Sequence, residues 1–346
     1  MWQHYSSMAL IKINERKDKN MNKIKNFLSD NVALVGLICI FILGTAIQST
    51  FLSADNLSNL FRSASIVGLI SIGMLFVILC GSIDLSVGSV FALSGYLFVV
   101  LSQTNPVIAI GVPLIFGVVM GFVNGFLIDK LRIPAFITTL ATMMLCRGIV
   151  LLVTKESTVR NGDLSSVLKS LGRANLTTFL SYPFLFFIAI SLLSAYFLHK
   201  FAIGRNMYIV GGNADAATMM GVSKSKTLYI AHILCSVLAC FAGIIFASRV
   251  GSAAPLAGTG YEMYAIAAVV IGGAQLNGGV GKVSGTFLGA LIMGSFSNIF
   301  NLQKFINAVW QDAIIGIVLL AVIIVQAVVH MGVFSFGTKN KNKLFK

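Results

Sequence analysis

Charged residues are scarce in this chain, and acidic residues are the scarcest of them. Only 10% of the 346 residues are charged, whereas 57% are hydrophobic. About a quarter of the residues of a soluble globular protein are charged, so the composition excludes that class. The apolar residues form continuous runs whose lengths are close to the ~20 residues that cross a bilayer as a helix. They do not alternate with polar residues, which excludes a β-barrel. The composition therefore predicts an all-α polytopic membrane protein.

With 11 acidic residues against 25 basic ones, the formal net charge is +14. The basic residues flank the apolar runs and are not interleaved with stacking aromatics, so we expect a lipid bilayer and no nucleic acid around them. The five cysteines all lie inside apolar runs, and no pair of them has the spacing of zinc ligands. No nucleophile, base and orienting acid occur together. We therefore expect neither an enzyme nor a bound metal or cofactor.

The apolar runs predict ten membrane segments. These are 32–51, two within 64–101, 107–128, 134–153, 178–198, 228–247, two within 265–300, and 313–331. A short interfacial helix is expected to begin near Asp55, ahead of the second segment. The domain plan is a basic cytoplasmic extension (1–31), one membrane domain (32–333) and a basic cytoplasmic tail (334–346).

The distribution of Lys and Arg predicts the orientation. If both termini are cytoplasmic, most of the cations lie inside, in line with the positive-inside rule. The loop 154–177 fits this assignment least well, because four cations would lie outside: Lys155, Arg160, Lys169 and Arg173.

Two glycine-rich interruptions divide long apolar runs. In the first, GSIDLSVGS (81–89), Asp84 and Ser86 are polar residues inside an apolar stretch. The preferred interpretation is that Asp84 caps the half-helix that follows; the alternative is direct contact with a transported ligand. Arg147 is expected to reach the interface or to pair with an acid such as Asp84. His232 and His330 are expected to be packed.

The second interruption, IGGAQLNGGVGK (271–282), superficially resembles a phosphate-binding loop. Leu276 stands where the first glycine of that motif belongs, and Val283 follows Lys282, so the phosphate-loop interpretation is rejected. Its glycines are expected to permit a broken helix and close helix contacts. Both interruptions share the spacing Gly-x-x-x-Leu-x-x-Gly, which is compatible with paired breaks in two halves of a transporter.

The basic loop 199–226 contains the signals of a short helix. Asn213 is a favourable N-cap, Asp215 lies in the first turn, and Gly221 is a natural stop. A helix of about two turns is unstable alone in water. We therefore expect it to rest on the membrane domain or on another protein, and to act as the docking element through which a partner moves the membrane segments.

Four blocks of the sequence resemble permease subunits of the ribose, galactose, xylose and arabinose group of ABC importers. They are GSIDLSVGS (81–89), NGFLIDKLRIPAFITTLATMMLCRG (124–148), GRNMYIVGGNADAATMMGV (204–222) and IGGAQLNGGVGKVSGTFLGAL (271–291). The resemblance implies the ABC importer permease fold in a bacterial inner membrane. It also implies a second permease copy, two cytoplasmic ATPase subunits that use ATP and Mg²⁺, and an extracytoplasmic solute-binding protein.

The basic loop also resembles the coupling motif of such importers, with Asp in place of Glu. The corresponding residues are Gly212, Asn213, Asp215, Ala216, Ala217 and Gly221. Asp84, Ser86, Asn124, Asn298 and Asn301 are candidates for the translocation path or the broken helices, and the four outer cations named above are candidates for docking the binding protein.

The expected function is that of the membrane subunit of an ATP-driven importer for a monosaccharide or a related sugar-like solute. The rival interpretation is an ion-coupled secondary transporter, which also uses broken helices but needs a coupling-ion site. Within the family, an autoinducer-type sugar, a nucleoside or a branched-chain amino acid is an alternative solute.

Overall fold

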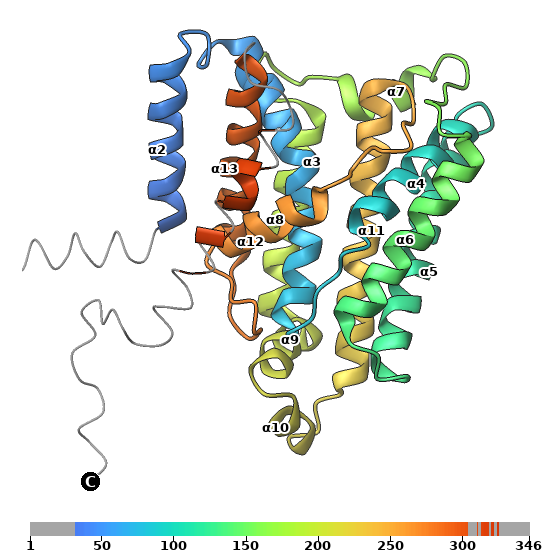
Figure 1. Ribbon diagram of the computed structural model, residues 1–346, viewed down its shortest axis with the longest axis vertical. Helices are drawn as coiled ribbons and strands as arrows, with labels where there is room; N and C mark the ends of the chain where they lie inside the picture. The colour runs from blue at the N-terminus through green and yellow to red at the C-terminus, as the bar shows by residue number, and fades with distance from the viewer. Residues whose placement is uncertain (1–31, 304–309, 311–312, 318–319, 322–323, 325–346) are drawn as a thin grey trace, which may run out of the picture.

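The computed structural model describes residues 32–303, 310, 313–317, 320–321 and 324, and these residues form helices and no named strand (Figure 1). The helices are α2 (Val32–Ile47), α3 (Ala54–Leu79), α4 (Val87–Leu101), α5 (Pro106–Asp129), α6 (Ala135–Thr154), α7 (Ser166–Arg173), α8 (Tyr182–Lys200), α9 (Ala202–Gly212), α10 (Ala214–Met219), α11 (Lys224–Val250), α12 (Tyr261–Ile271) and α13 (Val283–Leu302).

Six of these helices are long and apolar enough to cross a membrane: α3, α5, α6, α8, α11 and α13. Three shorter apolar helices, α2, α4 and α12, accompany them within the described part of the chain. Most of the segment 313–331, the tail 334–346 and the extension 1–31 fall outside the described residues. The predicted total of ten segments therefore stays a prediction.

The predicted interfacial helix at Asp55 is wrong as a separate element. Asp55 lies in the first turn of α3, which runs without interruption for 26 residues, with Ser53 as its N-cap. At about 1.5 Å per residue such a helix is longer than the about 30 Å hydrocarbon core. A single helix can therefore carry both the polar turns and the membrane segment. The first predicted segment is also shorter than expected, because α2 ends at Ile47 and not at Phe51.

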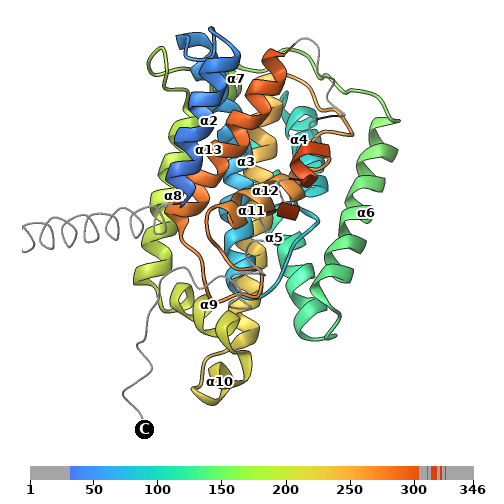
Figure 2. The same ribbon diagram turned by 60° about the vertical axis from the view of Figure 1, so that its left-hand side comes forward.

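Helices α3 and α11 form the centre of the molecule. In their most apolar windows 89% and 61% of the residues are buried, against 28% in α5, α6 and α8. A helix that is apolar on all sides belongs in an interior, whereas the outer helices present apolar side chains to lipid. Figure 2 shows α2 and α6 on opposite edges of the bundle.

Each glycine-rich interruption coincides with a non-helical segment. The first, 80–86, joins α3 to α4, and the second, 272–282, joins α12 to α13. Gly81, Gly278 and Gly279 have φ angles of 70°, 90° and 72°, a region that favours glycine. The interpretation of each pair of helices as one interrupted membrane helix stays a prediction.

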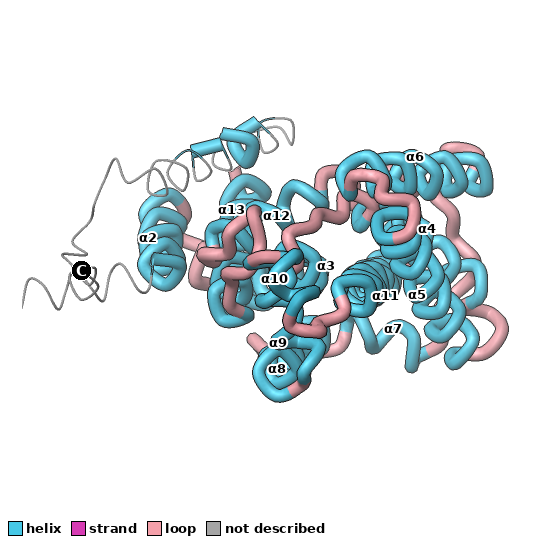
Figure 3. The backbone as a smooth tube through the Cα atoms, turned by 90° about the horizontal axis from the view of Figure 1, so that it is seen from below, coloured by secondary structure: helices cyan, strands magenta, loops and turns pink. Residues whose placement is uncertain are grey.

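The basic loop lies at the lower end of the molecule in Figure 1, where α9 and α10 connect α8 to α11. Helix α9 packs against α3, α8 and α11, and α10 packs against α9 and α11; Figure 3 shows this end of the molecule from below. Helix α7 lies at the opposite end. The two ends thus carry different polar elements, joined by apolar helices.

Candidate functional site

A polar cluster lies where the segment 80–86 meets α5 and α11. Its members are Asp84, Ser86, Asn124 and His232, and each of these residues is fully buried. Three of the four were candidates from the sequence. The structure brings these three together, which the sequence could not establish.

One oxygen of Asp84 orders the turn before α4. Its Oδ1 accepts hydrogen bonds from the Ser86 backbone N–H at 2.9 Å and from the Ser86 hydroxyl at 2.6 Å. Ser86 itself holds the N-cap position of α4 and makes no side-chain cap bond. Asp84 is therefore not the N-cap residue of α4, as predicted, but it accepts a hydrogen bond from the backbone N–H of the residue that is, Ser86.

The other oxygen of Asp84 binds two different helices. Its Oδ2 lies 3.3 Å from Nδ1 of His232 on α11 and 3.4 Å from Nδ2 of Asn124 on α5. The second ring nitrogen of His232 lies 3.1 Å from the hydroxyl of Ser82. An ionised carboxylate only accepts hydrogen bonds, so an ionised Asp84 requires the Nδ1 nitrogen of His232 to be the donor. The break between α3 and α4 is thereby tied to α5 and α11.

His232 is the member that sequence reasoning missed. It was expected to be packed, and it is buried, but its ring is the partner of Asp84. The expected partner Arg147 instead donates to the carbonyls of Pro255 at 2.6 Å and Ala257 at 3.0 Å. The only signal in the sequence was that His232, like Asp84, is a titratable residue inside an apolar run. The two residues are far apart along the chain, so their pairing leaves no local pattern.

The cluster holds unused hydrogen-bonding capacity. Oδ1 of Asn124 and the hydroxyl of Ser236, one turn beyond His232 on α11, are buried without a partner among the described residues. Buried polar groups are normally paired, so such groups mark a place where the arrangement changes or where another polar group enters. All four members are closed to solvent in this arrangement.

The other two asparagine candidates lie elsewhere. Asn298 and Asn56 exchange two side-chain hydrogen bonds, of 3.0 Å and 2.9 Å, which join α13 to α3. Asn301 is exposed near the end of α13. The structure therefore places neither residue in the cluster around Asp84, and it gives Asn298 a role in helix packing.

Helix α10 has the cap that the sequence predicted. Oδ1 of Asn213 accepts hydrogen bonds from the backbone N–H groups of Asp215 at 3.1 Å and Ala216 at 2.9 Å. Gly221 follows the helix with a φ of 77°. Both features are local and were therefore accessible from the sequence.

The two faces of α10 differ in exposure. Ala217 is fully buried against the protein, whereas Met219 and Met220 are 88% and 65% exposed. Two large apolar side chains in water at the tip of a polar loop are typical of a surface that a partner protein covers. Ala217 thus supports α10, and the methionines form its free face.

The upper end of the molecule contains a small basic pocket of about 240 Å³. Three of the four predicted docking cations line it: Arg160, Lys169 and Arg173. Lys155 is not among the residues that line it and lies at the C-cap of α6 with a φ of 50°. Two of these cations have partners within the protein. Nζ of Lys169 lies 3.7 Å from Oδ1 of Asp163, and Nε of Arg173 donates to the Arg249 carbonyl at 2.8 Å.

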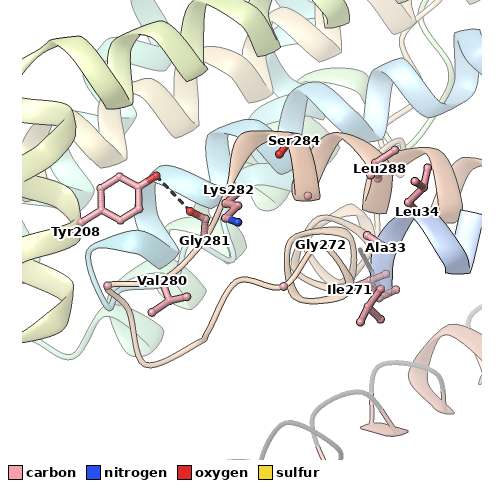
Figure 4. Close-up of a pocket in the computed structure, with 14 residues that line it drawn as sticks. Ala33, Leu34, Tyr208, Ile271, Gly272, Val280, Gly281, Lys282, Ser284 and Leu288 are labelled. Carbon is pink, nitrogen blue, oxygen red and sulfur yellow. Dashed lines mark hydrogen bonds between the residues drawn. The ribbon is translucent and has the colours of Figure 1, made fainter. Parts of the chain in front are cut away.

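A larger cavity of about 580 Å³ lies beside the second glycine-rich segment, between α2, α9, α12 and α13 (Figure 4). Tyr208 of α9 and residues 279–282 lie along it, and the Tyr208 hydroxyl donates to the Gly281 carbonyl at 3.2 Å. The cavity therefore adjoins the contact between the basic loop and the second interruption.

Comparisons with known proteins give one consistent family. The profile described as "branched-chain amino acid transport system / permease component" matches residues 56–323. The ribose import permease protein RbsC of Escherichia coli K12 is 36% identical over 87% of this chain and 95% of its own length. The Bacillus subtilis 168 protein of the same name is 37% identical over 89% of this chain and 94% of its own.

The autoinducer 2 import system permease protein LsrC of Salmonella paratyphi B is 38% identical over 86% of both chains. No solved structure matches the chain. The profile match over residues 56–323 covers the first interruption, the basic loop and the second interruption.

Proposed function

Because the chain belongs to the family of permease components that this profile describes, we propose that it carries a sugar across the bacterial inner membrane. The chain is the membrane permease subunit of an ABC importer, as are its relatives. The observation that supports a sugar is the similarity to ribose and autoinducer 2 permeases over at least 86% of this chain. The solute proposed is ribose or a related monosaccharide.

The name of the family profile makes a branched-chain amino acid the alternative solute. Uptake of radiolabelled ribose and leucine by cells that express or lack the permease would distinguish them. We expect ribose uptake to fall to background when the permease gene is deleted and to return on complementation, while leucine uptake is unchanged. Loss of leucine uptake alone would contradict the proposal.

The proposed arrangement places the lower end of Figure 1 in the cytoplasm, with both termini on that side. Most basic residues then lie inside, as the positive-inside rule requires. Ten membrane segments per subunit and a dimer of permeases complete the proposed domain 32–333. A separate ATPase subunit would use ATP and Mg²⁺ and would dock on the cytoplasmic loop, with the solute-binding protein on the opposite side.

In the proposed mechanism, closure of the ATPase subunits moves the loop 199–226 and the helices rock between inward-facing and outward-facing states. The coupling residues would be Gly212, Asn213, Asp215, Ala216, Ala217 and Gly221. The exposed methionines of α10 support this role, because they leave an apolar contact surface uncovered. Asp84, Ser86 and Asn124 would hold the break near the path in position.

An ion-coupled secondary transporter is the less favoured mechanism. It would need an accessible ionisable site in the membrane domain. Asp84 in the break after α3 and His232 on α11 are a candidate for such a site, but both side chains are closed to solvent. The importer proposal needs no such site, since a partner supplies the energy.

Substitution of Arg160 by Glu is expected to impair docking of the binding protein and to leave assembly with the ATPase intact. Arg160 is exposed at the basic pocket, and charges at the rim of an interface steer encounter. We expect the concentration of binding protein for half-maximal ATPase stimulation to rise by about tenfold. This factor corresponds to about 1.4 kcal/mol of binding free energy.

The matched control for this charge reversal is Lys130→Glu, an exposed cation at the opposite end of the molecule. It should leave the half-maximal concentration unchanged. A parental response from Arg160→Glu, at low as well as at physiological salt, would remove Arg160 from the docking surface, because low salt strengthens such effects.

A further inference from the structure

Three segments that are far apart in the sequence meet at the lower end of the bundle. They are the end of α3 with its following turn (79–81), the end of α9 (208–212) and the glycine loop (277–281). We call this contact the glycine junction. It joins the basic loop to both glycine-rich interruptions at once.

The centre of the glycine junction is a backbone hydrogen bond that leaves no room for a side chain. The N–H of Gly279 donates to the carbonyl of Leu79 at 3.0 Å. A methyl group on Gly211 would overlap that carbonyl oxygen and lie 2.6 Å from the Gly279 nitrogen. Glycine at 211 is therefore required for α9 to reach both partners of this bond.

The neighbouring glycines pack equally closely. A methyl group on Gly278 would lie 2.7 Å from the Gly81 nitrogen and 2.9 Å from the Gly211 Cα. A methyl group on Gly279 would lie 2.8 Å from the Gly212 Cα. Backbone thus packs on backbone among all three segments, without a flexible side chain that could absorb a displacement.

Tyr208 adds a side-chain contact to the same junction. Its hydroxyl donates to the Gly281 carbonyl at 3.2 Å, as Figure 4 shows. Burial raises the pKa of the Tyr208 hydroxyl above its ordinary value, so it stays protonated as a donor. This contact can be removed without changing any glycine.

Resting on the proposed function, we propose that the glycine junction transmits movement of α10 to both interruptions. Only Asn213 separates α9 from α10, so displacement of α10 moves the end of α9. That end contacts Leu79, which leads into Asp84 and its cluster, and the glycine loop, which leads into α13. Gly211, Gly279 and Tyr208 are the positioning residues of this link.

The test follows the glycine loop while the ATPase subunit binds nucleotide. Val280, which is 46% exposed, is replaced by Cys in a Cys39→Ser background. Cys39 is exposed and the other four cysteines are buried, so a maleimide labels the new cysteine. In the co-purified complex, ATP with vanadate is expected to change the labelling rate by at least about threefold, because labelling follows the population of each state.

Gly211→Ala is expected to abolish this response while the ATPase still co-purifies. Gly111→Ala is the control, because a methyl group at Gly111 in α5 meets no atom within 4 Å. If Gly211→Ala yields no folded complex, Tyr208→Phe is the test variant. It is expected to lose at least about half of the nucleotide-dependent change in labelling rate.

A full response in the assembled Gly211→Ala or Tyr208→Phe complex would overturn the proposal, as would an unresponsive parent complex. Absence of any co-purified ATPase from the parent protein would instead count against the importer mechanism. The two failures are therefore distinguishable. Labelling requires no transported solute, so the identity of the sugar does not enter the result.

Discussion

Substitution of Met219 by Arg is expected to reduce the ATPase subunit that co-purifies with the permease by at least about tenfold. Met219 is 88% exposed on the free face of α10, where we propose that the ATPase docks. The loss of a central interface residue costs about 2 kcal/mol or more. A tenfold loss of affinity corresponds to about 1.4 kcal/mol, so the expected loss of affinity exceeds tenfold. A buried Arg would add an unpaired charge to that cost.

The measurement is quantitative co-purification from native membranes, with the permease tagged. Leu176→Arg is the control, since Leu176 is 61% exposed in the loop after α7, at the other end of the molecule. It should retain the parental amount of ATPase. Equal recovery with Met219→Arg would exclude the methionine face of α10 as the docking surface.

Substitution of Asp84 by Asn is expected to destabilise the protein by about 3–5 kcal/mol. The change removes the charge that His232 faces and leaves Asn124 and His232 as donors that both need an acceptor. The apparent melting temperature in detergent should fall by roughly 6–10 °C, since each kcal/mol corresponds to about 2 °C in a large chain.

Asp163→Asn provides the control for Asp84→Asn, because its side chain is 99% exposed. The double variant Asp84→Asn with His232→Leu should be less destabilised than the sum of the single variants, because each change removes the need for the other partner. Additive effects would show that the two side chains are not coupled. A parental melting temperature for Asp84→Asn would contradict the buried pair itself.

The sequence predicted the features that depend on neighbouring residues. Asn213 and Gly221 were identified as cap and stop because the chemistry of a helix end involves only a few adjacent residues. The apolar runs predicted the long helices for the same reason. Asp84 was identified as unusual because a charged residue inside an apolar run is costly wherever its partner lies.

The contacts between distant segments could not be predicted. His232 approaches Asp84 only because α11 packs beside the break after α3, and no local pattern in either segment encodes that packing. The close approach of Gly211 to Leu79 is similar: glycines were expected in the breaks, but not a meeting of both breaks with α9. The separate helix predicted at Asp55 is wrong because the apolar residues Leu57, Leu60 and Phe61 between polar ones belong to the first turns of the long helix α3.

The burial of α3 also has a consequence for synthesis. Its main partner α11 begins at Lys224, and at about 5–20 residues per second the ribosome needs on the order of 10 s to extend the chain from Leu79 to that point. During this interval α3 has no α11 to cover it, so its buried hydroxyls at Ser65 and Ser71 need partners within the helix. The hydroxyl of Ser71 donates to the Val67 carbonyl at 2.8 Å, and that of Ser65 donates to the Phe61 carbonyl. These two hydroxyls therefore need no partner from α11 while α3 is in the bilayer and α11 is not yet synthesised.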